Sequence, residues 1–127
     1  MNENKTNQKY DLEERTAKFG EDMVDFVKTI EKSEINRPLI NQIIRSATSI
    51  GANYMEANGA GSKKDFRNKI CICKKEARET KYWLRIISKA NSEKLDNCRL
   101  LWQEAHELTL IFSKIIISST NQNPEKI

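Results

Sequence analysis

The sequence is poor in the residues that build turns and metal sites. Its 127 residues include four glycines, two prolines and one histidine. A β-rich chain draws on glycine and proline for its many turns, so these counts argue against an all-β fold. The single histidine, His106, has no cysteine partner at zinc-ligand spacing, and we interpret it as a surface or packing residue.

Cysteines and long apolar segments are scarce as well. Cys71 and Cys73 are two residues apart and therefore point to different sides of a helix, which leaves Cys98 without a partner. We interpret all three as free thiols that pack as small hydrophobic residues in a reducing compartment. The longest apolar stretch, residues 108–117, contains Lys114 and is too short to span a bilayer. No apolar targeting segment opens the chain, so we expect a cytoplasmic protein without membrane contacts.

No familiar catalytic motif is present. The chain has no phosphate-binding loop, no glycine fingerprint after a strand and no nucleophile elbow. Its carboxylates do not form the Glu-x-x-His pairs of di-iron bundles. We therefore expect a protein that is not an enzyme and that binds no metal and no cofactor.

Four segments place apolar or small residues at alternating steps of three and four. These seams run from Leu12 to Ile30, from Ile40 to Ala57, from Phe66 to Ile87 and from Cys98 to Ile115. Such spacing keeps one face of a helix against its neighbours. Because the connections between the segments are short, the sequence predicts an all-α fold, an antiparallel up-down-up-down four-helix bundle.

The breaks between the segments carry signals for helix ends. Pro38 suits the first turn of the second helix, and Gly59 and Gly61 provide a stop after it. Ser62 followed by Asp65 is a variant of the capping box and predicts the start of the third helix.

By its length the chain is one domain. We predict a bundle over residues 10–118, between flexible tails at 1–9 and 119–127. Gly20 and Gly51 lie inside predicted helices, where each costs about 1 kcal/mol relative to alanine. They indicate either tolerated local weakness or, at Gly51, a close crossing of two helices.

A file of polar side chains runs down the second predicted helix, within about 80° of arc. Three interpretations are open: a solvated face, a structural polar network that sets helix register, or a catalytic group. We predict the network, with the first three side chains bonded to neighbouring helices and the last to backbone at the next connection. On that basis, truncation of Asn53 or Glu56 to alanine would cost about 1–3 kcal/mol. The polar file comprises Arg45, Ser49, Asn53 and Glu56.

Positive charge is concentrated in the third predicted helix. Residues 63–89 hold ten basic and three acidic residues, a net charge of +7, whereas the whole chain carries +4 and the remainder therefore −3. Arg67 and six further cations that lie within about 40° of it around the helix form a line about 40 Å long, which we call the basic stripe. The basic stripe comprises Lys63, Arg67, Lys74, Arg78, Lys81, Arg85 and Lys89.

The basic stripe has three candidate surroundings. A line of uncompensated cations is the electrostatic footprint expected for a phosphate backbone. The alternatives are an acidic face, on another subunit or on the first predicted helix, and plain solvent. We predict binding of RNA or DNA that is dominated by phosphate contacts, because nothing in the chain resembles a base-reading motif.

Further apolar residues lie outside the four seams. A single bundle has difficulty covering them, and uncovered apolar patches mark interfaces. We therefore predict a homo-oligomer, the alternative being one unusually wide seam in a single bundle. These residues are Ile72, Trp83, Ile86, Leu95, Trp102, Leu110, Ile116 and Ile117.

Three stretches resemble, in order, a bacterial four-helix-bundle family first recognised in proteins encoded within intervening sequences of 23S ribosomal RNA genes. They are RSATSIGANYMEA at residues 45–57, GSKKDF at 61–66 and KEARETKYWL at 75–84. The likeness covers residues 10–118. Gly51 replaces a usual proline and Ala57 a usual glycine, and the loss of that glycine lets the second helix continue toward Gly59.

The resemblance implies a ring of bundles, typically a homopentamer. It also implies kinship with the accessory variability determinant of diversity-generating retroelements, a basic pentameric bundle that binds nucleic acid and its reverse transcriptase. By this resemblance, the four residues of the polar file occupy the family's signature positions in the second helix, and Glu79 occupies the position of its characteristic acid in the third helix. Since this chain contains no reverse transcriptase, we assign it no retroelement role.

The combined prediction is a non-enzymatic, ring-forming bundle that binds RNA or DNA through the basic stripe. The resemblance implies an accessory role beside a nucleic-acid enzyme, such as a reverse transcriptase. The rival is a structural or protein-interaction oligomer that binds no nucleic acid.

Overall fold

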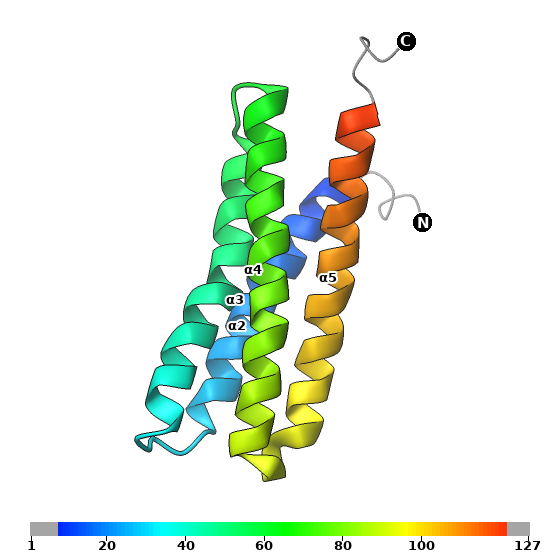
Figure 1. The fold of residues 1–127 in the computed structure, drawn as a ribbon. Coiled ribbons are helices and arrows are strands. Elements are labelled where there is room, and N and C mark those ends of the chain that lie inside the picture. Colours follow the sequence, from blue (N-terminus) through cyan, green and yellow to red (C-terminus); the bar gives the residue numbers. More distant parts are fainter. Residues whose placement is uncertain (1–7, 122–127) are drawn as a thin grey trace.

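A computed structural model describes residues 8–121 of the chain as four long helices. Successive helices run in opposite directions and are joined by short connections (Figure 1). The prediction of an all-α four-helix fold is confirmed. The helices are α2 (Gln8–Lys28), α3 (Asn36–Asn58), α4 (Lys63–Ala90) and α5 (Leu95–Asn121), with a short 3-10 helix, η1 (Ser92–Lys94), before α5.

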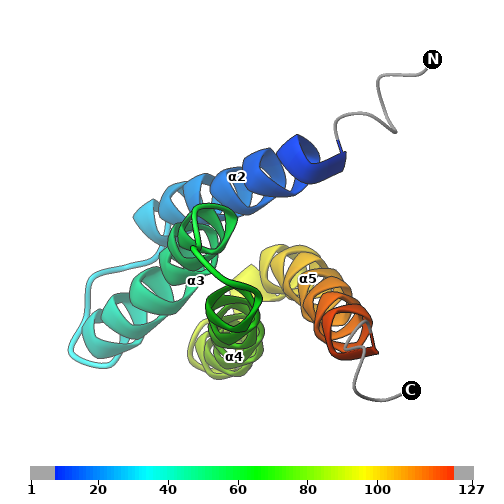
Figure 2. The same ribbon diagram turned by 90° about the horizontal axis from the view of Figure 1, so that it is seen from above.

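Helix α4 lies between α3 and α5 in the bundle (Figure 2). It forms extensive interfaces with both α3 and α5, as the view from above shows (Figure 2). Helix α2 crosses α3 at an angle, and in the view from above its first residues project away from the other helices (Figures 1 and 2). It packs mainly against α3 and only sparsely against α5. The α2–α5 edge is therefore the most weakly packed side of the bundle.

The four predicted seams form the hydrophobic core. Most of their residues are almost fully buried, and several have no exposed surface at all. Four seam residues are only partly buried and pack against the rim of the core. Burial of a large aliphatic or aromatic side chain contributes about 1.5–3 kcal/mol, so these seams hold the helices together. The four partly buried seam residues are Ile40, Phe66, Leu101 and Ile115.

Two glycines let α2 approach α3 closely. A Cβ atom on Gly51 would lie 3.4 Å from backbone atoms of Thr16, and one on Gly20 would lie 3.6 Å from Cγ2 of Thr48. The interpretation of Gly51 as a close helix crossing is confirmed. At Gly51 a Cβ atom would just reach van der Waals contact, so a side chain larger than alanine there would push the two helices apart.

The helix boundaries agree with most of the predicted signals. Helix α3 extends to Asn58 and is followed by Gly59. This agrees with the expectation that the helix continues past Ala57, which stands where the family usually has glycine. The Ser62 side chain accepts a hydrogen bond of 3.1 Å from the backbone N–H of Asp65 and caps α4. Pro38 lies in the first turn of α3.

The predicted tails need a correction. Helix α2 already begins at Gln8 and α5 continues to Asn121, so the ends of the bundle exceed the predicted 10–118. The remaining parts of the predicted tails, 1–7 and 122–127, lie outside the described residues. Within the described residues, no helix is both long and apolar enough to cross a membrane.

The three cysteines are free thiols, as predicted. Cys73 and Cys98 are buried, and burial raises the pKa of Cys73 to about 12 and that of Cys98 to about 11. Cys71 is exposed on α4, so the prediction that all three thiols pack as small hydrophobic residues is wrong for this one. Thiolate is the reactive form of cysteine, and burial keeps Cys73 and Cys98 in the unreactive thiol form. Cys71 is therefore the cysteine that thiol reagents can reach.

A pair of buried amides closes one end of the bundle. Asn36, at the start of α3, and Asn91, just after α4, exchange two side-chain hydrogen bonds of 2.9 Å. Each amide also donates to a backbone carbonyl, Asn36 to Glu31 and Asn91 to Ile87. Buried polar groups are tolerated when satisfied in this way, so the pair sets the relative position of the two helix ends.

We predict that Asn36→Ala and Asn91→Ala each lower the free energy of unfolding by about 1–3 kcal/mol, because each leaves the partner amide unsatisfied. The double variant should cost less than the sum of the two single variants. Urea denaturation of all four proteins measures both quantities. Asn97→Ala, which removes an exposed amide, is the control and should change stability little. Strictly additive single effects would contradict the pairing.

Candidate nucleic-acid interface

The basic stripe lies along α4, the helix that packs against both α3 and α5. Four of its cations are exposed and three are partly buried. Among the described residues, none of the seven forms an ion pair with a carboxylate. The exposed members are Lys63, Arg78, Arg85 and Lys89, and the partly buried members are Arg67, Lys74 and Lys81.

Two acids of α4 are directed away from the basic stripe. Glu76 and Glu79 both pair with Arg45 on α3, and the Nη2–Oε1 distance to Glu76 is 3.1 Å. The Glu76 side chain is buried, and the hydrogen bond that it accepts is the main reason that the pKa of Arg45 is raised. Arg45 and Glu79 are both signature positions of the resemblance, so this ion pair joins two of its motifs across the α3–α4 interface.

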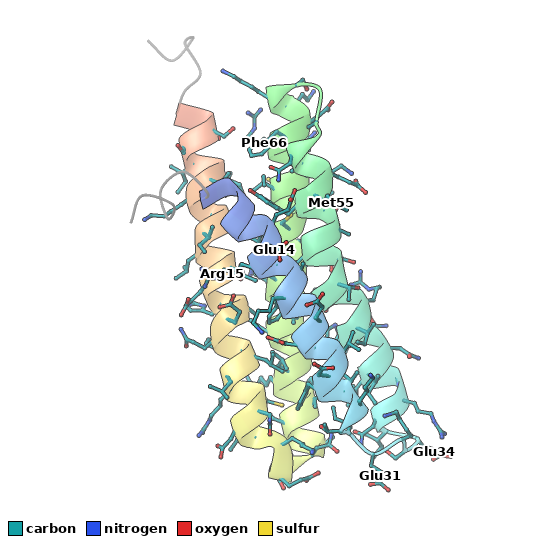
Figure 3. The ribbon with its side chains drawn as sticks, turned by 180° about the vertical axis from the view of Figure 1, so that it is seen from behind. Glu14, Arg15, Glu31, Glu34, Met55 and Phe66 are labelled. Carbon is teal, nitrogen blue, oxygen red and sulfur yellow. The ribbon has the colours of Figure 1, made fainter. Side chains whose placement is uncertain are left out.

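The acids at the centre of α5 are also engaged elsewhere. Arg15 extends from α2 toward α5 (Figure 3) and pairs with Glu104 and Glu107 at 2.7 Å each. Its hydrogen bond with Glu104 is the main cause that raises the pKa of Arg15, and bonds from Gln103 and then Arg15 lower the pKa of Glu107. These ion pairs bridge the sparsely packed α2–α5 edge and leave Glu104 and Glu107 without a role at the basic stripe.

The acidic face of α2 does not meet the basic stripe either. Glu13, Glu14 and Glu21 border an apolar hollow of about 420 Å³ between α2 and α3, whose floor includes Gly51 and Met55. No carboxylate in the described part of α2 pairs with the basic stripe, so the structure does not support neutralisation of the stripe by the first helix of the same subunit. An acidic face on another molecule stays open as a prediction.

Lys81 is the member of the basic stripe that contacts α5. Its Nζ lies 3.1 Å from Nδ1 of His106 and 5.1 Å from the centre of the Trp102 ring. His106 stacks on Trp102, with ring centres 5.0 Å apart. Burial, and then the nearby Arg78, lower the pKa of Lys81. This cluster was not predicted from the sequence, although the i,i+4 spacing of Trp102 and His106 places the two rings on one helix face.

An open hollow of about 470 Å³ lies beside the basic stripe on α4. Its residues follow one helical face over about three turns, and they combine cations, a thiol and an aromatic ring. Tyr82, at one end of the hollow, is 55% exposed. The lining residues are Cys71, Lys74, Lys75, Arg78, Glu79 and Tyr82.

The polar file is not the connected network that we predicted. Within the described part of the chain, only Arg45 and Glu56 of this file bond to another helix. Glu56 pairs with Lys69 of α4 at 2.6 Å rather than with backbone. Ser49 donates to the carbonyl of Arg45, and Asn53 to that of Ser49, both within α3. Short polar side chains reach the carbonyl four residues earlier, which explains why these two bonds stay local.

A second buried polar contact on α3 was not predicted. Ser46 and Thr80 hydrogen-bond at 2.9 Å in the α3–α4 interface, one turn from the Arg45 ion pairs. Each hydroxyl also lies within hydrogen-bond distance of a backbone carbonyl of its own helix, Ser46 of Ile43 at 3.3 Å and Thr80 of Glu76 at 2.8 Å. Within the described residues, no group of three or more histidine, cysteine or acidic side chains is arranged to hold a metal ion.

Comparison with known proteins gives a family and a fold. The 23S rRNA-intervening sequence protein family matches residues 8–114. A solved structure of a protein of unknown function, from the S23 ribosomal protein family of Bacteroides thetaiotaomicron, is similar with a TM-score of 0.72 and 31% identity. The match covers 82% of this chain and 96% of that one. No curated protein is a significant match.

We predict that Arg45→Ala lowers the free energy of unfolding by about 1–3 kcal/mol, because it leaves the buried Glu76 carboxylate without its partner. Adding Glu76→Gln should recover part of the loss, since a neutral amide costs less to bury than a charge. Thermal or urea denaturation measures both effects.

The matched control is Glu56→Ala, which breaks an exposed ion pair and should cost only about 0–1 kcal/mol. This replaces the larger cost predicted from sequence for Glu56. If Arg45→Ala lowered the free energy of unfolding no more than Glu56→Ala does, the Arg45–Glu76 contact would contribute no more to stability than an exposed ion pair.

Proposed function

The chain belongs to the 23S rRNA-intervening sequence protein family, and from that premise we propose that it is a non-enzymatic helical-bundle protein that binds RNA or DNA through the basic stripe of α4. Its solved relative is of unknown function, so the proposal rests on this chain's own residues. The observation that carries it is a line of seven cations, none of them paired with a carboxylate among the described residues. A nucleic-acid backbone presents a matching line of anions.

The surroundings of the basic stripe support a ligand of repeated negative charge. Glu76 and Glu79 are held by Arg45, and Glu104 and Glu107 by Arg15. Like charges that crowd together on one helix repel each other, and counter-charges from a ligand would relieve that repulsion. Binding of this kind is dominated by phosphates and has little base specificity.

The proposal assigns no catalytic role to the polar file. Ser49 and Asn53 bond to their own helix, and Arg45 and Glu56 are engaged in ion pairs. General acid–base catalysis needs a group that is free to exchange a proton with a substrate in a pocket. The bonding of these four side chains supports a structural role instead.

The second candidate function is that of a structural or protein-interaction oligomer. Three large apolar side chains of α5 are more than half exposed, Leu100 at 75%, Leu110 at 53% and Ile117 at 60%. Leu110 and Ile117 are two turns apart and share a helix face. Such a face supports assembly with other copies, and the family resemblance implies five of them in a ring. The two functions are compatible, since a ring would repeat the basic stripe and add avidity.

We predict that a labelled RNA or DNA binds with an affinity that falls steeply as salt rises. The log–log slope should be about −0.9 per phosphate neutralised on duplex DNA and about −0.7 on a single strand. Simultaneous charge reversal of Arg67, Arg78 and Arg85 to glutamate should abolish binding and leave the helix content unchanged. Fluorescence anisotropy across a salt series, with circular dichroism of each variant, tests this.

The matched control reverses Lys18, Lys28 and Arg37, which are exposed on α2 and α3 and change the net charge equally. It should retain most of the binding. Equal losses in the two triple variants would indicate attraction by net charge alone. Absence of binding by the parent protein at low salt would favour the protein-interaction rival.

We predict that light scattering at micromolar concentration gives a multiple of the 14.7 kDa chain mass. The double variant Leu110→Glu and Ile117→Glu should shift the distribution toward the monomer, because buried unpaired charges oppose association. Glu substitution of Lys28, which is exposed on α2 and lies outside this face of α5, is the control and should leave the mass unchanged. A monomeric parent protein would rule out the ring.

A further inference from the structure

We propose that the hollow beside Tyr82 is a stacking site for an unpaired nucleobase, so that the preferred ligand of the basic stripe is single-stranded RNA or DNA. This inference rests on the proposed function and specifies its substrate class. It is carried by the position of one exposed aromatic ring within a cluster of cations on α4.

Tyr82 has the properties of a stacking platform. Its ring is 55% exposed, although large aromatic side chains are usually covered in a core. The ring contacts Trp83 with centres 5.0 Å apart and planes at 73°, an edge-type contact that supports the ring without a parallel neighbour. Aromatic rings that stand at a surface in this way offer their area to a planar ligand.

The cations around Tyr82 are placed to hold a backbone beside the stacked base. Arg78 is one turn from Tyr82, and Lys74 and Lys75 are two turns away on the same hollow. None of these three forms an ion pair among the residues that the structure describes. Basic grooves that contain aromatic side chains are the arrangement by which proteins bind single strands without sequence preference.

The other exposed aromatic residue near the stripe is less suited to this role. Trp102 already stacks on His106 and has the Lys81 ammonium 5.1 Å from its ring centre. A base would have to displace these contacts. Among the residues that the structure describes, Tyr82 has no parallel stacking partner, and we therefore assign the stacking role to it.

The preference for single-stranded over duplex nucleic acid follows from the accessibility of the base faces. In a duplex the bases are already stacked on one another, and a side chain on a straight helix reaches only the phosphates and groove edges. In a single strand the bases are free to turn out and stack on aromatic rings. A site that gains from both phosphate contacts and stacking therefore favours the single strand.

The test compares labelled single-stranded RNA and DNA of 20 nucleotides with the corresponding duplexes, at one low salt concentration. The parent protein should bind the single strands more tightly. Tyr82→Ala should weaken single-strand binding about 5- to 150-fold, the effect of losing one stacked base, and leave duplex binding unchanged. Tyr82→Phe keeps the ring and should retain the parent affinity. Met55→Ala, which removes an exposed apolar side chain on α3, is the control.

A footprint locates the bound strand independently. Cys71 lines the same hollow and is the exposed cysteine, whereas Cys73 and Cys98 are buried. Bound single strand should slow alkylation of Cys71 in the parent protein, and slow it less in Tyr82→Ala at equal strand concentration.

The outcomes separate this inference from the function on which it rests. Salt-sensitive binding of all four ligands with no strand preference, and no effect of Tyr82→Ala, would overturn the stacking site and leave phosphate binding by the basic stripe intact. Binding of neither single strand nor duplex would overturn both. Loss of single-strand affinity in Tyr82→Phe as well as in Tyr82→Ala would show that the hydroxyl, rather than ring stacking, is responsible.

Discussion

Burial of the apolar seam of α4 is the constraint on which the other features depend. Helix α4 lies between α3 and α5, and residues such as Ile70, Leu84 and Ile87 are almost completely removed from solvent. A turn of one residue position, about 100°, would expose them at a cost of about 1.5–3 kcal/mol each. This burial fixes the rotation of α4 about its axis. The same rotation decides which side chains face α3, which face α5 and which face solvent.

The distribution of charge is a consequence of that rotation. With the seam buried, Glu76 and Glu79 face α3, where Arg45 binds them, and the basic stripe is left on the opposite side. On α5, Glu104 and Glu107 are directed to Arg15 because α2 crosses at that level. Each pair also has a structural use, one on the α3–α4 interface and one on the sparsely packed α2–α5 edge. The ion pairs that hold the bundle together therefore also engage these four carboxylates, and none of the four pairs with the basic stripe.

Different parts of the bundle are stabilised by different means. The α2–α3 interface depends on close backbone approach at Gly51, and the α3–α4 interface combines apolar burial with the Ser46–Thr80 hydroxyl contact. At the end of these two helices, Asn36 and Asn91 satisfy each other in a buried site. Buried polar pairs of this kind tolerate little displacement, since a shift leaves donors and acceptors unmet. They complement the seams, whose apolar contacts are less directional.

The sequence by itself determined the helices, their seams and the existence of the basic stripe, because these are properties of spacing within one segment. It also indicated the helix ends, through Ser62, Gly59 and Pro38, since caps are local interactions. Only the tertiary structure decided which side chains meet between helices. It divided the predicted polar file into two local bonds and two ion pairs, and it showed the Asn36–Asn91 pair that no spacing had suggested. Contacts between helices depend on their relative rotation and axial shift, and neither quantity is encoded in the periodicity of a single helix.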